Sequence, residues 1–455
     1  MRQWIPGFHL FRRHPRTSHR VINASPPFVL AGGFALLIAL GACLLKLPFA
    51  TTSPISWFES FFTATSAVTV TGLIVVDTAT QFSHWGQLII AGLIQLGGLG
   101  FMTFAVVAAL SLGGRISVRE QIVAQEALHQ TNMSKVGSTA KAVLLIAVTV
   151  ELIGIILLTL VWWPQQGFAD AAFNALFHTI SAFNNAGFAL WSDSLMGYVG
   201  SVPVVLLITA LFIIGGLGFG VLVNIYDERR WQRMAVYTKI ILLATLLINL
   251  IAFAVYWWLE KDNPATLGHL TLGDQALAAW FQAVTPRTAG FNTVDTGALT
   301  HGSAVFTLLL MFIGAGSMST GGGIKLGTFI VLWAATRAFL RRYERVTIMR
   351  RTVAQSLVMK SLAVALISLA LLFSAIFLMV ANDDLPFLDI VFEAVSAFGT
   401  VGLSRGITSD LSTFSQSVIM LLMFVGRVGP ITLAYFLATP KKGFIRYPET
   451  DVQVG

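Results

Sequence analysis

The chain has 455 residues, of which 56% are hydrophobic and only 11% are charged, and its formal net charge is +8. A soluble domain usually carries about 25% charged residues, so this composition excludes a water-soluble fold and indicates a chain embedded in a bilayer. The single cysteine excludes an internal disulfide and a metal site made of several thiolates.

Eight apolar stretches follow one another along the chain. A helix needs about 20 apolar residues to cross the hydrocarbon core, and each stretch reaches that length. They cover 27–49, 83–112, 141–163, 201–225, 237–259, 303–336, 358–381 and 413–438. The sequence therefore predicts an all-α, polytopic membrane protein.

Basic residues gather in alternate connections between these stretches. The clusters are 2–20, 115–141, 229–239, 337–351 and 441–446. With eight spans they all fall on one side, which the positive-inside rule makes cytoplasmic, so both termini are expected in the cytoplasm. This placement accounts for the positive charge without nucleic acid, and contact with a cytosolic partner is an added possibility.

A half-apolar segment, too short and too polar to cross, lies between each odd span and the next even one. The four segments are 58–73, 173–188, 276–291 and 388–403, and they align without gaps on a glycine followed by Leu or Phe. An aromatic residue stands ten positions before each glycine. The glycines are Gly72, Gly187, Gly290 and Gly402. A repeat of this spacing extends over the whole chain.

Each copy continues with a second patch of small residues, called here the glycine patch, inside the following span. The patches are 97–100, 215–218, 314–317 and 426–429. Small residues let helices pack closely in a bilayer, so packing alone explains any single patch, whereas four matched patches support a fourfold repeat.

The repeat divides the chain into nine parts. They are a basic cytoplasmic N-terminus (1–25), repeat one (26–112), a cytoplasmic loop (113–140), repeat two (141–225), a second loop (226–236), repeat three with a broken inner helix (237–336), a basic loop (337–355), repeat four (356–438) and a cytoplasmic tail (439–455).

Four such units around one axis predict a cation pore. Non-helical backbone at membrane depth is tolerated where it is buried in protein or lines a wet cavity. Glycine adopts positive φ at little cost, a ring of carbonyls can replace an ion's hydration shell, and short helices ending at the axis favour a cation there. The fold expected is helix, pore loop, helix, repeated in a pseudo-fourfold, potassium-channel-like arrangement.

The candidate ion-binding residues form four filter segments that lack a carboxylate, which favours backbone coordination. They are Thr69, Val70, Thr71 and Gly72; Asn184, Asn185, Ala186 and Gly187; Arg287, Thr288, Ala289 and Gly290; and Gly399, Thr400, Val401 and Gly402. Arg287 is expected to snorkel or to brace its filter segment. His178 is expected to pack, and Glu151 to make a structural hydrogen bond sooner than to serve transport.

The third glycine patch opens a run, 314–325, called here the glycine-rich loop. Glycine costs about 1 kcal/mol in a helix relative to alanine, so we predict a broken helix, acting either as a gate or ion contact or as a passive kink. Arg427 is costly within a span and could form a positive barrier or pair with an acid or with loop hydroxyls. The candidate gate residues are Gly314, Gly316, Ser317, Ser319, Thr320, Gly321, Gly322, Gly323, Lys325 and Arg427.

The filter segments T-V-T-G-L, N-N-A-G-F, R-T-A-G-F and G-T-V-G-L resemble those of the Trk/Ktr/HKT superfamily of potassium transporters, over nearly the whole chain. Eight spans are most similar to the KtrB-type membrane subunits of bacterial Ktr systems. The resemblance implies sodium-dependent uptake of K⁺, with Na⁺ as a possible second ion, in a bacterial inner membrane. It also implies a homodimer, an intramembrane gate at the glycine-rich loop, and a cytosolic KtrA-type ring that binds ATP or ADP.

Two other classes remain to be weighed. A secondary transporter with broken helices would predict a twofold or inverted repeat, which four parallel copies disfavour. A membrane enzyme would need clustered His, Asp or Glu or a nucleophile with a base, and the sequence contains no such cluster, so no enzymatic activity and no organic cofactor are expected.

Overall fold

The computed structural model describes residues 26–100 and 136–429. Apart from one short β-hairpin, the regular structure of these residues is helical. The predicted N-terminus, most of the first cytoplasmic loop and the C-terminal tail lie outside the described residues.

Each repeat begins with a long apolar helix. These helices are α1 (Pro26–Leu45), α7 (Val136–Gln166), α11 (Val236–Glu260) and α15 (Gln355–Asn382), and all four are long and apolar enough to cross a membrane. They carry large apolar side chains exposed to the surroundings, as lipid-facing helices do.

The half-apolar segments form short helices that end inside the protein, called here the pore helices. They are α2 (Trp57–Thr69), α8 (Phe168–Phe183), α12 (Leu272–Val284) and α16 (Phe387–Gly399). The first begins at a capping box, in which the Ser56 hydroxyl accepts from the Glu59 N–H at 3.1 Å and the Glu59 carboxylate accepts from the Ser56 N–H. Their buried aromatic side chains belong to three large hydrophobic clusters.

In its described part, the second helix of each repeat is shorter or interrupted, and 101–112 and 430–438 of the predicted second and eighth spans lie outside the described residues. These helices are α4 (His84–Leu99), α9 with α10 (Val202–Leu217 and Phe219–Glu228), α13 with α14 (His301–Phe312 and Leu326–Leu340) and α17 (Thr413–Val428). The remaining elements are α3 (Thr78–Gln81), the 3₁₀ helix η2 (Met196–Tyr198) and the antiparallel strands β1 (Thr347–Ile348) and β2 (Arg351–Thr352).

The fourth predicted span, 201–225, is not one continuous helix. Its two halves, α9 and α10, are bent by 95°. Gly218 lies between them with φ of +101°, and a side chain there would overlap the carbonyl oxygen of Ser317. The glycine therefore breaks the helix where the glycine-rich loop of the third repeat lies against it, a contact that apolar length alone does not reveal.

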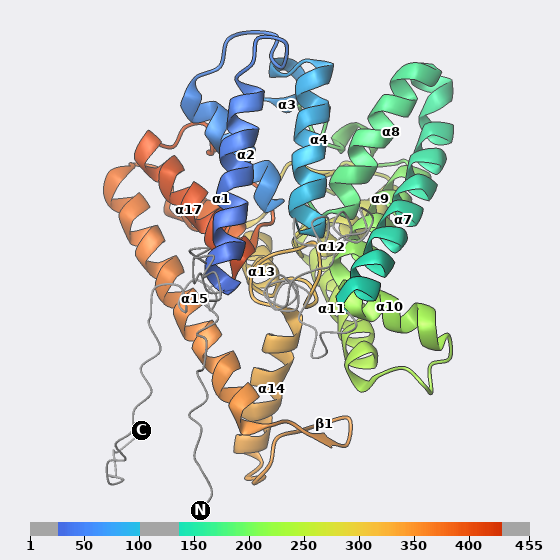
Figure 1. Cartoon of the computed structure of the whole chain (residues 1–455), viewed down its shortest axis with the longest axis vertical. Coiled ribbons are helices and arrows are strands. Elements are labelled where there is room, and N and C mark those ends of the chain that lie inside the picture. The colour runs from blue at the N-terminus through green and yellow to red at the C-terminus, as the bar shows by residue number, and fades with distance from the viewer. Residues whose placement is uncertain (1–25, 101–135, 430–455) are drawn as a thin grey trace, which may run out of the picture.

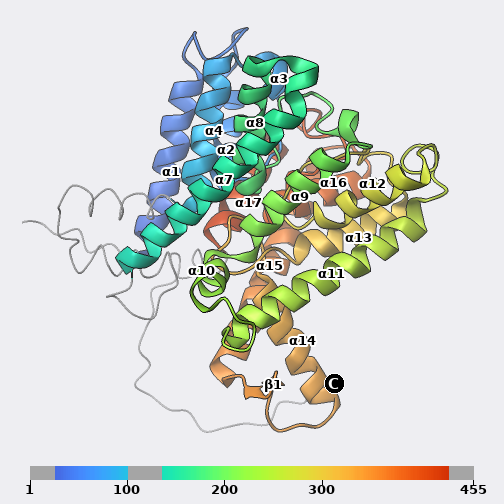
Figure 2. The same ribbon diagram turned by 90° about the vertical axis from the view of Figure 1, so that its right-hand side faces the viewer.

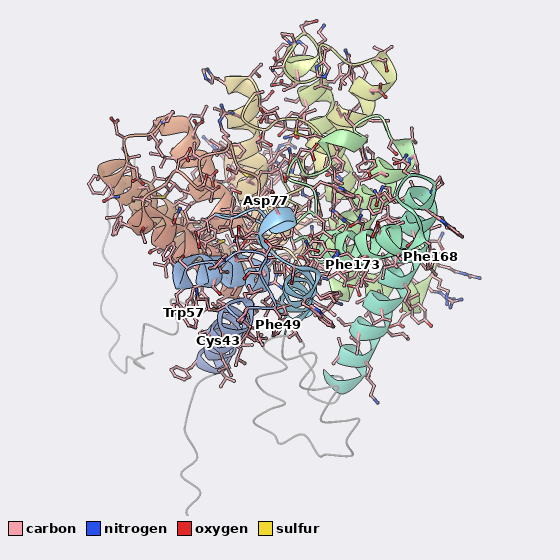
Figure 3. The ribbon with its side chains drawn as sticks, turned by 90° about the horizontal axis from the view of Figure 1, so that it is seen from above. Cys43, Phe49, Trp57, Asp77, Phe168 and Phe173 are labelled. Atoms are coloured by element: carbon pink, nitrogen blue, oxygen red, sulfur yellow. The ribbon has the colours of Figure 1, made fainter. Side chains whose placement is uncertain are left out.

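The four repeats follow one another around a common centre. Viewed from above, the ribbon passes from blue through green and yellow to orange around the middle of the molecule, where Asp77 lies (Figure 3). Helix α14 with the β hairpin extends away from the body at one end (Figures 1 and 2).

Candidate ion pathway

Each filter segment repeats one backbone conformation. The four glycines have φ between +70° and +95°. The residue two positions before each glycine also has positive φ: Val70 at 58°, Asn185 at 59°, Thr288 at 76° and Thr400 at 49°. Positive φ is rare for β-branched residues, and such strain is held where the surrounding structure imposes it, often at functional sites. The glycines were expected to have positive φ, whereas the second position was not predicted.

The four segments meet in cyclic order. A side chain on each of three filter glycines would overlap a carbonyl oxygen of a neighbouring segment, and one on Gly187 would lie 2.9 Å from the Cα of Gly290. The overlaps are Gly72 with Ala186, Gly290 with Val401 and Gly402 with Thr71. The order is therefore one, two, three, four and back to one, so repeats two and four are opposite. Only glycine fits this approach of four backbones.

A hydroxyl behind each filter segment fixes its backbone. Ser66 and Ser396 accept hydrogen bonds from the N–H groups of Gly72 and Gly402 at 3.0 and 3.1 Å. Ser181 instead donates to the Phe188 carbonyl at 2.7 Å. In the gapless alignment, these three serines share one position, six residues before the filter glycine.

The third repeat departs from the gapless alignment by one residue. Thr285, five residues before Gly290, takes the serine's role by donating to the Phe291 carbonyl at 2.5 Å. The residue six positions before Gly290 is Val284, which has no hydroxyl. Phe281, not Trp280, is the fully buried aromatic. The Ala289 N–H bonds to the carbonyl four residues back, whereas Thr71, Ala186 and Val401 bond five residues back. The third connection between pore helix and filter is therefore one residue shorter.

A polar cavity of about 320 Å³ lies on the outer side of the four glycines. All four filter glycines line it together with the side chains of Asp77, Asp295 and several hydroxyl-bearing residues. The carboxylates lie beyond the glycine ring, so they can attract cations electrostatically without occupying the filter segments.

On the other side of the ring, the glycine-rich loop lies directly against three filter segments. The Thr320 hydroxyl donates to Asn185 Oδ1 at 2.8 Å, and the Gly322 N–H donates to the Thr400 hydroxyl at 2.9 Å. A side chain on Gly321 would overlap the Thr288 hydroxyl. The loop thus contacts the positive-φ residue of each of these segments, a role for those side chains that the sequence did not suggest.

The loop is also fixed to the glycine patches of repeats two and four. The Gly316 N–H donates to the Gly216 carbonyl at 2.8 Å, and the Gly323 N–H donates to the Gly426 carbonyl at 3.2 Å. Gly314 closes the loop on itself through the Ile324 carbonyl at 2.9 Å. The predicted break in the third inner helix is therefore an ordered structure with many backbone hydrogen bonds.

Arg427 joins this loop to the first repeat. Its guanidinium donates to the Thr320 carbonyl and to the carbonyls of Gly97 and Gly98, the last at 2.8 Å. The side chain pairs with backbone oxygens, not with the acid or loop hydroxyl considered from the sequence. Lys325 donates to the Gly321 carbonyl at 2.6 Å within the loop. Two cationic groups thus lie beneath the ring of glycines.

Two predicted gate residues remain, Ser317 and Ser319. Ser317 lies where α9 meets α10, and its N–H donates to the Tyr237 hydroxyl at 3.3 Å. The buried Ser319 hydroxyl has no hydrogen-bond partner among the described residues.

The side chains at the third position before the filter glycine in repeats two and three bond to the long helices behind them. Asn184 donates to Gln95 at 2.7 Å and to Glu151 of α7 at 3.2 Å. Arg287 donates to Asn249 of α11 at 3.2 Å. These contacts agree with bracing by Arg287 and with a hydrogen-bonding role for Glu151. Gln95 and Asn249 were missed because lone amides within spans give no recognisable pattern.

The glycine patches explain how the inner helices approach the pore helices. Side chains on Gly97, Gly215 and Gly426 would overlap the carbonyl oxygens of Val68, Phe183 and Phe398, each four residues before its filter glycine. The glycine patches therefore allow close helix packing, the simplest interpretation of these patches, and in three repeats the packing partner is the end of the pore helix.

Comparison with known proteins places the chain in a family. Residues 39–447 match the family described as TrkH, cation transport protein. The chain is 50% identical to the Ktr system potassium uptake protein B of Bacillus subtilis, over 95% of this chain and 98% of that protein. It is 43% identical to the protein of the same name from Vibrio alginolyticus, over 94% and 95% of the two chains.

Two further relatives extend the comparison. The potassium/sodium uptake protein NtpJ of Enterococcus hirae is 36% identical over 95% of this chain and 97% of that protein. The crystal structure of the potassium transporter TrkH from Vibrio parahaemolyticus matches with a TM-score of 0.73 at 20% identity, over 92% of this chain and 86% of that one. The chain is a multi-pass membrane protein that belongs to the TrkH family of cation transport proteins, and this family consists of transporters, not enzymes.

Proposed function

We propose that the chain takes up K⁺ across a bacterial cytoplasmic membrane through a pore formed by its four filter segments. One observation carries the proposal: four copies of the same positive-φ backbone converge in cyclic order at the end of four short helices. Backbone carbonyls held in such a ring can replace the water around a desolvated K⁺. The relatives named as potassium uptake proteins support this choice of ion.

The glycine-rich loop and Arg427 act in this proposal as the gate. The loop and Arg427 lie beneath the filter segments. Hydrogen bonds join the loop to the side chains of Asn185 and Thr400 in the filter segments, and Arg427 donates to the Thr320 carbonyl of the loop. A loop held by individual hydrogen bonds, each worth about 0.5–1.5 kcal/mol, can be released by a modest change in binding energy. A passive kink would not require contacts with three filter segments.

Regulation is proposed to come from outside this chain. The relatives' name as Ktr system proteins supports the presence of a further component, and we propose that the chain works as a homodimer on a KtrA-like cytosolic ring that binds ATP or ADP. The relative named as a potassium/sodium uptake protein supports a part for Na⁺. A secondary transporter with broken helices is disfavoured by four copies arranged in one cyclic order.

The test is rescue of growth at low external K⁺ in a bacterium that lacks its own K⁺ uptake systems. Cells expressing the chain together with a Ktr-type regulatory subunit should accumulate K⁺, and faster with external Na⁺ than without it. If cells with normal amounts of the protein in the membrane show no K⁺ accumulation above the empty vector, the proposed function is wrong. Equal uptake with and without Na⁺ would contradict only the sodium dependence.

A further inference from the structure

Each pore helix carries a buried polar residue at one equivalent position. These residues are Thr63, His178, Gln282 and Glu393, all at most 1% exposed. The position is nine residues before the filter glycine, or eight in the third repeat, where the connection is one residue shorter. The four side chains differ in what they reach.

His178 bonds the chain that leaves the second filter segment. Its Nε2 accepts from the backbone N–H of Leu190 at 3.2 Å, three residues beyond Gly187, while Nδ1 lies 2.8 Å from the Asn174 carbonyl. Because a carbonyl only accepts and a backbone N–H only donates, Nδ1 carries the proton and the ring is neutral. The ring also stacks on Trp191, with centroids 4.2 Å apart. His178 is therefore more than the packing residue predicted from sequence.

Glu393 bonds the chain that leaves the fourth filter segment. Its carboxylate accepts from the hydroxyl of Ser404 and from that of Thr408, the latter at 3.1 Å. The backbone N–H of Arg405, three residues beyond Gly402, also interacts with this carboxylate. Glu393 and His178 thus occupy the same position, and both bond the chain that follows their own filter glycine, although the two side chains are chemically unrelated.

Arg405 extends this connection to the third repeat. Its guanidinium forms a largely buried ion pair with Asp389 of α16 at 2.5 Å and donates to the Thr296 carbonyl at 3.2 Å. Thr296 lies beyond the third filter segment, so the outer end of the fourth segment is attached both to its own pore helix and to its neighbour.

The equivalent residues of repeats one and three do not make this connection. The Thr63 hydroxyl has no hydrogen-bond partner among the described residues. The Gln282 side-chain amide is buried and likewise has no hydrogen-bond partner among the described residues. Since the cyclic order places repeats two and four opposite each other, the connected segments are diagonal across the centre, and the structure behind the ring is twofold.

We propose that His178 and Glu393 are positioning residues that hold two opposite filter segments from behind and thereby set the discrimination between K⁺ and Na⁺. The proposal rests on the proposed function. Selectivity of a carbonyl ring depends on the size and field of the ring. A segment released at its outer end can move its carbonyls toward the smaller Na⁺, so the loss of either residue lowers discrimination before it lowers flux.

The experiment compares initial K⁺ and Na⁺ uptake rates in cells expressing the full chain with its regulatory subunit. His178→Leu and Glu393→Leu remove the connection, whereas His178→Gln and Glu393→Gln retain an acceptor. Thr63→Val is the matched control, because it changes the equivalent buried position without breaking a hydrogen bond. We expect the K⁺/Na⁺ ratio to fall about fivefold or more in the leucine variants, from the loss of a buried hydrogen-bond acceptor, with recovery in the glutamine variants and no change in the control.

An unchanged ratio in both leucine variants, at normal abundance in the membrane, overturns the proposal. So does an equal loss of discrimination in Thr63→Val, which would show a general sensitivity of the pore helices. If the leucine variants do not accumulate, the double variant Ser404→Ala with Thr408→Val removes two hydrogen-bond donors to Glu393. An unchanged K⁺/Na⁺ ratio in this double variant also overturns the proposal. A wild-type chain that carries no K⁺ in this assay contradicts the proposed function, and the positioning role with it.

Discussion

At the scale of single residues, the filter segments depend on backbone conformations that few side chains tolerate. Every segment needs positive φ at two positions, and only one of them is glycine. Val70, Thr288 and Thr400 hold a conformation that is costly for β-branched residues, by about 1–3 kcal/mol each. That cost is offset by the surrounding hydrogen bonds from the pore helices and, for Thr400, from the glycine-rich loop.

Gly290→Ser tests the filter backbone. The residue has φ of +79°, and a side chain there would overlap the Val401 carbonyl oxygen, so the third and fourth segments must separate. We expect the apparent affinity for K⁺ and the K⁺/Na⁺ ratio to fall about tenfold, in line with the cost of strained backbone, as measured by uptake at graded concentrations.

The matched control is Gly92→Ser, since a side chain at Gly92 of α4 would meet nothing within 4 Å. If Gly290→Ser discriminates as well as this control does, the third filter segment does not contact the ion.

Thr400→Val tests the contact between filter and gate. The change keeps the shape of the side chain but removes the acceptor for the Gly322 N–H, 2.9 Å away. An unsatisfied buried N–H costs about 1–3 kcal/mol, so the loop is released more easily. Unregulated K⁺ flux should therefore rise by about fivefold or more, measured without the regulatory subunit.

Thr336→Val on the exposed end of α14, whose hydroxyl bonds only within its own helix at 3.0 Å, serves as the control. If K⁺ flux in Thr400→Val stays at the wild-type level, the hydrogen bond between the loop and Thr400 does not keep the gate closed.

At the scale of elements, the sequence predicted the repeat better than the continuity of its helices. Glycines followed by Leu or Phe located all four filter segments, because no other residue fits where four backbones meet. The glycine content of 314–325 predicted the break between α13 and α14. The bend at Gly218 was missed, since it arises from contact with Ser317 of another repeat and not from local composition.

The one-residue shift in the third repeat was missed for a related reason. Val284 and Thr285 are neighbours, and only the hydrogen bond from Thr285 to Phe291 shows which of them replaces serine. The contacts of Asn184, Arg287 and Arg427 likewise join residues 33 to 330 positions apart in the chain, a separation at which a single sequence carries no signal.

Shortening the glycine-rich loop tests its role as an element. Deleting 318–320 removes the contact of Thr320 with Asn185 and the carbonyl that accepts from Arg427. A gate should then leak, so K⁺ flux rises and depends less on the regulatory subunit. Flux at or below the wild-type level, with normal amounts of protein in the membrane, would favour a passive kink.

At the scale of the whole molecule, four similar units are combined into an unequal ring. Repeats two and four are attached behind their filter segments by His178 and Glu393. Repeat three supplies the glycine-rich loop, and Arg427 of repeat four joins that loop to the glycine patch of repeat one. The repeat builds the central ring, and the departures from it supply the contacts proposed to control it.

The ring of four filter glycines is proposed to select K⁺. The most direct measurement is K⁺ and Na⁺ flux into liposomes containing the purified full-length chain, with serine replacing each of Gly72, Gly187, Gly290 and Gly402 in turn. We expect wild-type protein to pass K⁺ in preference to Na⁺ and every substitution to reduce this preference. Unchanged discrimination in all four variants would show that the glycine ring does not select the ion.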